Sequence, residues 1–460
     1  MKKVHFIAIG GAVMHNLAIA LCQKGYKVSG SDDEIFEPAR SRLDQYGILP
    51  HDEGWFVQRI HPGLDAVILG MHARIDNPEL VRAQELGLKI YSFPEYIYEQ
   101  SRNKLRIVVG GSHGKTTITA MIMHVFRQCN KDFDYMVGSQ LEGFETMVRL
   151  SENAPVTVLE GDEYLTSPMD PRPKFHLYHP NIAVLSGIAW DHINVFPTFE
   201  NYTEQFRIFA SLIEFSGALV YCGEDEALVR IAAGLRSDVR SKAYSSPPHR
   251  IENGITLLET EFGDIPLLIF GKHNLQNLEA ARLACEYAGI PAGDFYTAIR
   301  SFKGASRRLE LIAHSGSCSV FRDFAHSPSK LSATINAVAG QFPERKLVAC
   351  MELHTFSSLS ENFLEQYRGS MDAATVPIVY FNPRTLEHKK LPPLTADRVK
   401  EAFRNPAIRV YTDSGLLQDD LLAMDWNNSN LLMMSSGNFD GIDMTALGPA
   451  VIRKAKPQQE

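Results

Sequence analysis

A glycine-rich segment that joins a short apolar run to a helical pattern constrains the fold of this chain more than any other feature. The run Ile107–Val109 is β-branched and predicts a buried strand, and the glycines after it predict a turn into a helix. At such a turn, backbone N–H groups at the helix N-terminus close around phosphate oxygens. We therefore predict an α/β fold that binds a nucleoside triphosphate, namely ATP. The loop residues in this prediction are Gly111, Ser112, His113, Gly114, Lys115, Thr116 and Thr117.

Lys115 and Thr116 are the loop residues with side chains suited to this chemistry. The Lys115 ammonium group would reach the outer phosphates, and the Thr116 hydroxyl would bind Mg²⁺. The loop sequence is GxxGKTT, because Val109 stands where the longer GxxxxGK[ST] pattern has its first glycine. The alternative is an ordinary glycine-rich turn without a ligand, but the flanking strand and helix favour the phosphate site.

Composition bounds the number of domains and argues against some partners. At roughly 100–200 residues per domain, the 460 residues allow about two to four domains. A net charge of −8 without a basic stripe argues against a nucleic-acid partner. The six cysteines are scattered, which fits a reducing compartment, and no run of 18 apolar residues occurs. We therefore expect a cytoplasmic protein that does not contact membranes.

The N-terminal segment predicts a Rossmann-like βαβ unit. Val4–Ile9 is an apolar strand, Gly10 and Gly11 form a turn into a helix, and the next strand ends at Asp32. A carboxylate about 20 residues after the glycines is placed to contact a ribose hydroxyl. The glycine pattern is incomplete, so a dinucleotide, a UDP-sugar and no ligand all stay open. His72 follows a further strand and is either a ligand contact or a solvated loop residue.

Acidic and histidine residues follow two strands of the central segment. Glu160 ends the strand Val156–Leu159, and such an acid beside a phosphate loop is where Mg²⁺ is held. His192 follows the strand Ile182–Leu185 and could bind a second metal ion, or it could be a loop histidine beside a helix cap. Further on, the side chains of Asn274 and Asn277 could bind the adenine edge or could cap a helix.

The C-terminal segment predicts a second doubly wound sheet. Arg307 and Arg308 follow a glycine-containing hinge, and paired arginines in a cleft suit phosphate binding. Asp323 and His326 directly follow a strand, at the sheet edge where ligands bind. The predicted buried strands are Ser319–Phe321, Lys346–Met351, Ile378–Phe381 and Leu431–Met434.

Taken together, these motifs resemble those of the Mur ligase family. The order GxxGKTT, E-x-DE, DH, GxHNxxN, RRxE and D-[FY]-AH-x-P spans nearly the whole chain. The resemblance implies an α/β protein of three domains: a Rossmann-like UDP-sugar-binding domain at 1–104, a P-loop ATPase domain with a mostly parallel sheet at 105–306, and a Rossmann-like domain for an amino acid or peptide at 307–460. It also implies an enzyme that uses ATP to join a carboxylate to an amine through an acyl phosphate.

The resemblance assigns roles residue by residue. It implies that Lys115, Glu160, His192 and Arg308 are catalytic, and that Thr116, Glu160 and His192 bind the metal. It places Asn274 and Asn277 on the adenine side, and Arg308, Asp323 and His326 on the C-terminal side of the ATP site. The UDP-sugar would contact Gly10, Gly11, Asp32 and His72.

The expected substrates follow from one departure from the family pattern. Many members carry a carbamylated lysine where this chain has Phe206. Its absence points to the branch that acts on UDP-N-acetylmuramate. Within that branch, four segments resemble the members that add the tripeptide L-alanyl-γ-D-glutamyl-meso-diaminopimelate: Gly30–Pro38, Asp162–Tyr164, Phe324–His326 and Gly437–Ile442. The resemblance therefore implies the tripeptide as the acceptor, with addition of L-alanine as the alternative. A P-loop NTPase or a UDP-sugar-binding regulatory protein is the competing class. We expect a monomer or weak dimer.

Overall fold

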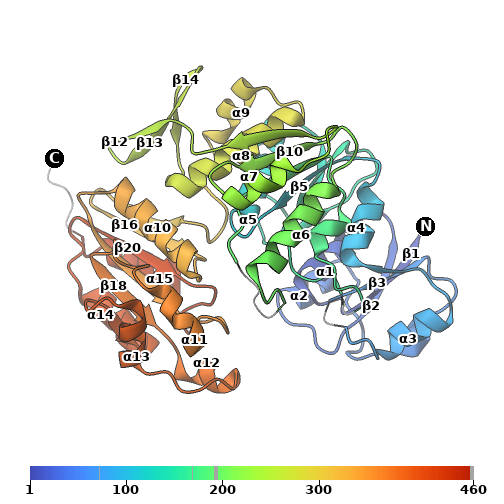
Figure 1. Cartoon of the computed structure of the whole chain (residues 1–460). Helices are drawn as coiled ribbons and strands as arrows, with labels where there is room; N and C mark the ends of the chain where they lie inside the picture. Colours follow the sequence, from blue (N-terminus) through green and yellow to red (C-terminus); the bar gives the residue numbers. More distant parts are fainter. Residues whose placement is uncertain (72, 168, 191–194, 456–460) are drawn as a thin grey trace. The chain divides into compact units, whose positions relative to one another are not determined.

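The structure is a computed structural model, and it describes residues 1–71, 73–167, 169–190 and 195–455 (Figure 1). Its internal contacts group into two compact units. The first contains Met1–Ser246 with Gln276–Ile299, and the second contains Pro247–Leu275 with Arg300–Glu460. The predicted domain boundary at residue 104 directly precedes a strand, and the one at 306 lies between a helix and a strand. Both boundaries stay predictions.

The first unit begins with a four-stranded parallel sheet of strand order β2-β1-β3-β4. Asn77 caps α3, because its side-chain oxygen accepts hydrogen bonds from the backbone N–H groups of Glu79 and Leu80. The elements are β1 (Lys3–Ile7), α1 (Ala12–Gln23), β2 (Lys27–Ser31), α2 (Ala39–Gln45), η1 (Val57–Arg59), β3 (Ala66–Leu69), α3 (Pro78–Glu85), β4 (Ile90–Ser92) and α4 (Phe93–Ser101).

The second sheet of this unit has seven strands in the order β11-β10-β9-β5-β8-β6-β7. Neighbouring strands are parallel except for the short antiparallel pair of β6 and β7. Its strands are β5 (Leu105–Gly110), β6 (Phe133–Met136), β7 (Val148–Arg149), β8 (Val156–Glu160), β9 (Ile182–Leu185), β10 (Ala218–Cys222) and β11 (Arg240–Tyr244). The helices are α5 (Lys115–Gln128), η2 (Lys174–Leu177), α6 (Phe199–Ser211), α7 (Glu226–Ala233), α8 (Lys272–Tyr287) and α9 (Ala292–Ile299). The residues of α8 before Gln276 group with the second unit.

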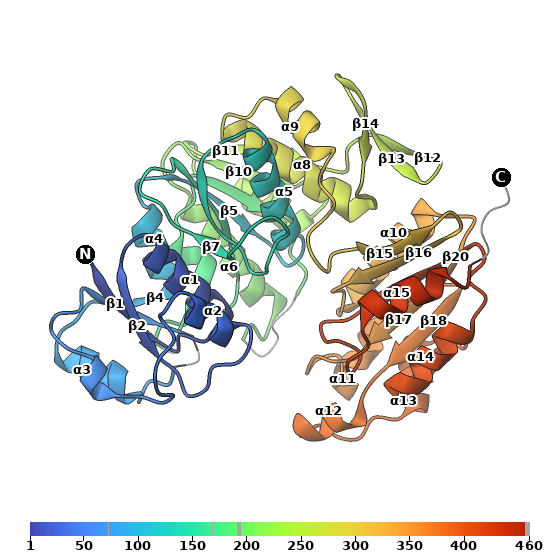
Figure 2. The same ribbon diagram turned by 180° about the vertical axis from the view of Figure 1, so that it is seen from behind.

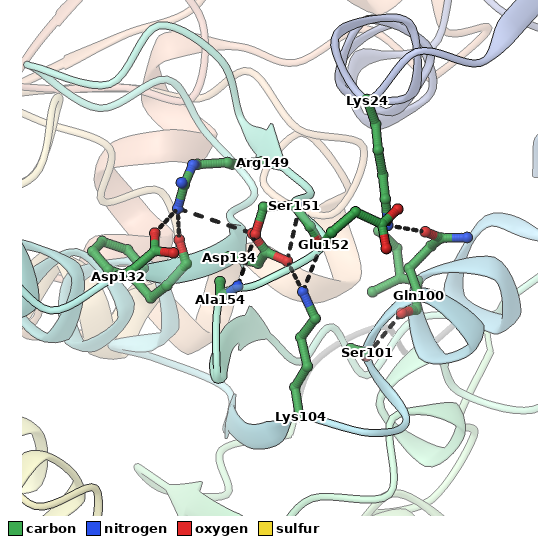
Figure 3. A network of polar contacts seen from close by, with 12 residues as sticks. Lys24, Gln100, Ser101, Lys104, Asp132, Asp134, Arg149, Ser151, Glu152 and Ala154 are labelled. Atoms are coloured by element: carbon green, nitrogen blue, oxygen red, sulfur yellow. Dashed lines mark hydrogen bonds and ion pairs between the residues drawn. The ribbon is translucent and has the colours of Figure 1, made fainter.

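Polar contacts join α1 and α4 to the β6–β7 region of this unit (Figure 3). Lys24, which follows α1, donates to Gln100 Oε1 at 2.8 Å and lies 3.3 Å from Glu152 Oε1. Lys104 Nζ lies 2.5 Å from Asp134 Oδ2, and both side chains are largely buried. Because a buried charge is costly without a partner, this pair resists separation of the segment before β5 from β6.

The second unit contains a small antiparallel sheet that the sequence interpretation missed. It consists of β12 (His249–Glu252), β13 (Ile255–Thr260) and β14 (Gly263–Leu267). Gln341, the last residue of α10, accepts a hydrogen bond from Thr256 Oγ1 at 3.0 Å and donates to the Gly254 carbonyl at 2.7 Å. These contacts fix the hairpin to the end of that helix.

The main sheet of the second unit has the strand order β15-β16-β20-β17-β18-β19, parallel except for the edge strand β15. Its strands are β15 (Glu310–Ser315), β16 (Cys318–Asp323), β17 (Lys346–Glu352), β18 (Val376–Tyr380), β19 (Arg409–Tyr411) and β20 (Ser429–Met434). Its helices are α10 (Pro328–Gln341), α11 (Glu361–Leu364), η3 (Glu365–Tyr367), α12 (Pro383–His388), α13 (Ala396–Phe403), α14 (Ser414–Ala423) and α15 (Met444–Ile452).

Both faces of this sheet are buried. Leu347, Ala349 and Met351 of β17 pack with residues of α10 and α13, whereas Val348 and Cys350 pack with residues of α14 and α15. The ribbon of the sheet and of these helices can be followed in Figure 2. A parallel strand covered on both faces has a continuous apolar sequence, which explains why the four central strands β16, β20, β17 and β18 were predictable. The edge strands β15 and β19 were not predicted. The α/β fold class with several mostly parallel sheets is confirmed. Among the described residues, no helix is both long and apolar enough to cross a membrane.

Candidate active site

The predicted phosphate loop connects the end of β5 to the start of α5. Gly111 and Gly114 have φ angles of 128° and 77°, which L-residues with a side chain rarely adopt. A Cβ atom on Gly111 would lie 2.1 Å from Ser186 Oγ, and one on Gly114 would lie 2.4 Å from Asn277 Oδ1. Both positions therefore need glycine for backbone conformation and for space. The turn leaves the N-terminus of α5 as a site for anionic oxygens.

The end of β9 holds the loop from one side. The backbone N–H of Ser112 donates to the Gly187 carbonyl at 2.9 Å, and Ser112 Oγ accepts the Ala189 N–H at 2.9 Å. Ser186 Oγ donates to the Gly110 carbonyl at 3.3 Å and also contacts the carbonyl oxygen of His113. The path of the loop is thus fixed by bonds to a neighbouring strand end.

Lys115 is held between a loop carbonyl and a buried carboxylate. Its Nζ donates to the Gly111 carbonyl at 2.8 Å and to Glu163 Oε2 at 2.6 Å, and the Glu163 side chain is 1% exposed. Burial acts to lower the pKa of Lys115, but the nearby carboxylates, Glu163 foremost, outweigh it and raise that pKa. Lys115 is therefore a fixed positive charge beside the helix N-terminus.

Thr116 and Glu160 place side-chain oxygen atoms beside this charge. Thr116 Oγ1 donates to Glu160 Oε1 at 2.9 Å, and Glu160 Oε2 accepts the Gly138 N–H at 2.8 Å. Burial raises the pKa of Glu160 above its usual value, against the lowering effects of the Gly138 N–H and Lys115. Mg²⁺ is commonly bound by one or two protein oxygens plus phosphates and water, and this pair fits that role. The described residues contain no cluster of three acidic, histidine or cysteine side chains that could hold a metal by themselves.

Two of the predicted ligands, His72 and His192, lie outside the described residues. Phe206, which the family resemblance predicts to stand at the position of the modified lysine, is fully buried. Its ring packs edge to face against Phe175 and Tyr202, with centroid distances of 5.4 and 5.1 Å. The structure therefore places an apolar core there.

The two asparagines of α8 occupy different environments. Asn277 lies against Gly114 of the loop. Asn274 is buried, and its side-chain amide donates to the Phe270 carbonyl at 3.0 Å. Because α8 begins at Lys272, both residues lie inside the helix, so the alternative that they act as N-caps is wrong. The adenine-binding role stays a prediction.

At the N-terminal turn, the Asp32 carboxylate is bonded to the backbone of its own domain. Oδ2 accepts the Gly10 N–H at 2.7 Å, and Oδ1 accepts the Asp33 N–H at 2.9 Å. Ala8 has a φ of 66°, and the N–H groups of Ala8 and Ile9 both donate to the Ser31 carbonyl. Asp32 thus fixes the glycine turn, a role that sequence analysis missed. Its predicted contact with a ribose hydroxyl stays a prediction.

A buried carboxylate on α3 stabilises the neighbouring end of β2. Glu79 is 0% exposed and accepts hydrogen bonds from Ser31 Oγ at 2.6 Å and the Phe56 N–H at 2.7 Å. Its other oxygen lies 3.1 Å from His5 Nε2. Sequence analysis missed Glu79, because a glutamate in the first turn of a helix is also what helix electrostatics favour on a surface.

In the second unit, Asp323 organises the segment that contains Arg308. Its carboxylate accepts the backbone N–H groups of Leu309 and Ala325, each at 2.6 Å. Burial raises the pKa of Asp323, although Arg308 and these N–H groups act to lower it. The Arg308 guanidinium lies 4.5 Å from the centroid of the Phe324 ring. The structure therefore brings these two predicted residues together.

His326 and the last glycine-rich loop lie at the same edge of this sheet. His326 Nδ1 is 2.8 Å from the Phe324 carbonyl, and its own carbonyl accepts a hydrogen bond from Tyr367. Glu352, at the end of β17, contacts Ser435 Oγ and accepts the Phe439 N–H at 2.8 Å. Sequence analysis missed this role of Glu352, although its place at a strand end was visible.

The described site in the first unit can neutralise and orient an anionic triphosphate. It combines a helix N-terminus, a fixed ammonium group and an oxygen pair suited to Mg²⁺. Two sequence patterns match the chain in the same region: that of the Mur ligase middle domain at residues 109–285 and that of the Mur ligase family catalytic domain at residues 3–104.

Two relatives show how far the similarity extends. A UDP-N-acetylmuramate–L-alanine ligase from Clostridium kluyveri is 31% identical over 376 residues, which cover 79% of this chain and 80% of the relative. A UDP-N-acetylmuramate–L-alanyl-γ-D-glutamyl-meso-2,6-diaminoheptandioate ligase from Haemophilus influenzae is 28% identical over 464 residues, covering 97% of this chain and 99% of the relative.

Solved structures share the fold over nearly the full length. A UDP-N-acetylmuramate–alanine ligase from Thermotoga maritima superposes with a TM-score of 0.69 at 20% identity, covering 99% of each chain. A murein peptide ligase from Psychrobacter arcticus has a TM-score of 0.64 at 23% identity, covering 97% of this chain and 99% of its own.

These matches define the class of the protein: it is an ATP-dependent ligase that forms an amide bond. The chain belongs to the Mur ligase family.

Proposed function

We propose that the enzyme joins the carboxylate of UDP-N-acetylmuramate to the amine of L-alanyl-γ-D-glutamyl-meso-diaminopimelate, a reaction of peptidoglycan recycling. The main support for an ATP-dependent step is the position of the Lys115 ammonium group at the start of α5. It is fixed there between the Gly111 carbonyl and Glu163. The near full-length similarity to the Haemophilus influenzae ligase supports the choice of the tripeptide.

The phosphate loop binds the triphosphate in this proposal. Backbone N–H groups at the start of α5 and the Lys115 ammonium group contact the outer phosphates. Asn277, which lies against Gly114, and Asn274 serve the adenine side. Arg308, Asp323 and His326 serve the ATP site from the C-terminal domain, where Asp323 positions the segment with Arg308.

Thr116 and Glu160 would hold Mg²⁺, with His192 as the ligand of a second ion. Bound Mg²⁺ supplies neutralisation of phosphate charge. The Thr116–Glu160 hydrogen bond of 2.9 Å keeps both oxygens together before any ion binds, and the Gly138 N–H orients the other carboxylate oxygen. The oxygen ligands are therefore preorganised by their own neighbours.

The first chemical step is attack of the sugar carboxylate on the γ-phosphorus of ATP, which gives an acyl phosphate and ADP. Both reactants are anions, so stabilisation of negative charge dominates the rate. Lys115 and Arg308 provide positive charge, and the raised pKa of Lys115 keeps that ammonium group protonated at neutral pH.

The second step is attack of the neutral amine of the peptide on the acyl carbon, which releases phosphate. A model α-amine has a pKa near 8, so a sizeable fraction is neutral at physiological pH. Water must be kept from the acyl phosphate, and a buried site does so. Gly10, Gly11, Asp32 and His72 hold the UDP-sugar in this proposal, with Asp32 fixing the turn.

We also propose that the enzyme acts in the cytoplasm as a monomer or weak dimer. All six cysteines are free, which fits a reducing compartment.

Lys115→Ala should abolish ATP cleavage and leave binding of UDP-N-acetylmuramate largely intact, because the lysine and the sugar-binding turn follow different strands. Phosphate release and calorimetric titration with the UDP-sugar measure the two properties. Lys242→Ala, an exposed lysine of β11, is the control for loss of a positive charge and should match the parent enzyme. Unchanged turnover in Lys115→Ala would refute the proposed site.

The acceptor is tested by phosphate release with ATP, UDP-N-acetylmuramate and either the tripeptide or L-alanine. We expect release with the tripeptide. Release with L-alanine instead would assign the alternative, which the Clostridium kluyveri relative and the Thermotoga maritima structure favour. ATP cleavage that needs no UDP-sugar would point to an NTPase or regulatory protein.

A further inference from the structure

The Tyr202 hydroxyl contacts both Ser112 of the phosphate loop and Glu163, the ion-pair partner of Lys115. We propose that this hydroxyl positions Lys115 for ATP. Tyr202 lies on α6, and none of the sequence motifs includes it. The inference rests on the proposed function of the loop, because it concerns how one catalytic side chain is held. In this scheme Tyr202 touches no substrate and acts on Lys115 through Glu163.

The hydrogen-bond donors and acceptors define a directed chain. The Tyr202 hydroxyl donates to Glu163 Oε1 at 3.1 Å, because an ionised carboxylate can only accept. Its oxygen is 3.0 Å from Ser112 Oγ, so Ser112 is the donor in that bond. Ser112 Oγ in turn accepts the Ala189 N–H at 2.9 Å. Each hydroxyl in this series therefore both donates and accepts.

Glu163 transmits the effect to the lysine. One carboxylate oxygen accepts from Tyr202, and the other lies 2.6 Å from Lys115 Nζ. Glu163 follows β8 in a loop, and its side chain is 1% exposed. With both oxygens bonded, the carboxylate plane is fixed, and so is the direction in which Lys115 is held. Charge-assisted bonds of this kind depend strongly on geometry.

Tyr202 is itself held rigidly. It is 0% exposed, and its ring packs against Phe196 and Phe206 with centroid distances of 5.4 and 5.1 Å. The helix that carries it starts at the cap residue Thr198, whose hydroxyl accepts the Asn201 N–H. On the same helix, the Gln205 carbonyl lies 2.8 Å from His176 Nε2. A hydroxyl on such a fixed ring is a precise anchor for a loop residue.

Tyr202→Phe separates the hydroxyl from the packing, because the buried ring is retained. Loss of a hydrogen bond to a charged group should lower kcat/KM for ATP about tenfold to a hundredfold. KM for UDP-N-acetylmuramate should stay within about twofold, because Asp32 and Gly10 fix the sugar-binding turn independently. Tyr244→Phe removes a hydroxyl from a tyrosine of β11 that is 5% exposed in the same unit, and it should leave all constants unchanged.

The steady-state constants distinguish positioning from simple packing. Glu163 lies 2.6 Å from Lys115 Nζ, so a carboxylate that is held less firmly should misalign the ammonium group and lower kcat. KM for UDP-N-acetylmuramate should not rise with it. A hydroxyl that only stabilises the fold would lower the melting temperature and leave kcat of the folded enzyme unchanged.

A double-mutant cycle with Glu163→Gln tests the connection directly. If Tyr202 acts through Glu163, Tyr202→Phe should have little further effect on kcat/KM for ATP in the Glu163→Gln background. Tyr244→Phe should leave kcat/KM for ATP unchanged in the Glu163→Gln background as well. If the fold-loss of the double variant equals the product of the fold-losses of Tyr202→Phe and Glu163→Gln, the two residues act independently and the inference is overturned.

The outcomes also separate this inference from the proposed function. Full activity in Lys115→Ala would remove both. Loss of activity in Lys115→Ala, combined with a Tyr202→Phe enzyme whose kcat and kcat/KM for ATP match the parent, would remove only the role of Tyr202.

Discussion

Each of the two mostly parallel sheets of the first unit contains a buried strand that leads through glycines into a helix. The first such turn follows β1 at Gly10–Gly11, and the second follows β5 at Gly111–Gly114. In both turns a carboxylate provides a decisive bond. At the first turn, Asp32 accepts a backbone N–H; at the second, Glu163 accepts from the ammonium group of Lys115. The same local design therefore occurs at the two turns where we propose that the UDP-sugar and ATP bind.

The difference lies in what each turn presents to a ligand. The phosphate loop adds a lysine and the oxygen pair of Thr116 and Glu160, which suits a triphosphate with Mg²⁺. The N-terminal turn contains no lysine, and its carboxylate adds negative charge beside the glycines. Such a turn suits hydroxyl groups of a sugar better than a densely charged phosphate chain. The comparison predicts that the two turns respond differently to equivalent substitutions.

The largest difference should come from glycine to alanine changes. Gly114→Ala places a Cβ atom 2.4 Å from Asn277 Oδ1 at a φ of 77°, so the loop must shift. A displacement of this size at a phosphate site should lower kcat about a thousandfold. Phosphate release in the complete reaction measures it.

Gly11→Ala is the matched change at the N-terminal turn. Gly11 has a φ of −57°, and a Cβ atom there would meet Met14 Cγ at 3.4 Å, an ordinary contact. The melting temperature should therefore stay close to that of the parent chain. A Gly114→Ala enzyme with parental kcat would show that the two turns are equally tolerant and would break the comparison.

The second prediction concerns Glu160, which has no counterpart at the N-terminal turn. Glu160→Gln keeps the shape but removes the charge that Mg²⁺ requires, and it should lower turnover about a hundredfold at limiting Mg²⁺. Because the lost charge weakens binding of the ion, excess Mg²⁺ should restore part of the activity by mass action. An unchanged dependence of turnover on Mg²⁺ concentration would indicate that other residues are the main ligands.

The same variant tests the raised pKa of Glu160 through protein stability. A carboxyl group whose pKa is higher in the folded than in the unfolded state stabilises the fold when it is protonated. Its contribution to the free energy of unfolding is fully present at pH values below the pKa of the unfolded state. That contribution is lost as the pH rises through the folded pKa. Compared with Glu160→Gln, the parent protein should therefore lose free energy of unfolding as pH rises from about 4.3. Urea denaturation without nucleotide or metal measures the difference, and parallel pH curves would contradict it.

Sequence alone predicted the parts of the site that depend on local patterns. The glycines, Lys115 and Thr116 are contiguous, and Glu160 follows a strand whose apolar run marks it as buried. Parallel strands bring their carboxyl ends to one edge, so Glu160 could be placed beside the loop without coordinates. The structure confirms that Thr116 and Glu160 are in contact.

Other contacts had no such signal. Tyr202 belongs to an amphipathic helix in which an aromatic residue is normally part of the core, and its partner Glu163 lies far away in sequence. The hairpin of β12 and β13 did have a signal. Asn253-Gly254 has positive φ angles at both residues, as a two-residue hairpin turn requires, but the short polar strands obscured it.

The smallest effect is expected at Asp32. Asp32→Asn leaves one side-chain oxygen, so only one of the two bonds to the Gly10 and Asp33 N–H groups can persist. Loss of a charge-assisted bond should weaken binding of UDP-N-acetylmuramate about tenfold. KM for ATP should stay the same, because the phosphate loop is fixed by Gly187 and Ala189 instead. Asp33→Asn, an exposed neighbour, is the control for charge. An equal rise in KM for ATP and KM for UDP-N-acetylmuramate in Asp32→Asn would mean that the two turns act as one site. A change confined to the first turn cannot loosen a phosphate loop that is held by the end of β9. Such a result would therefore require that the bound ligands connect the two turns.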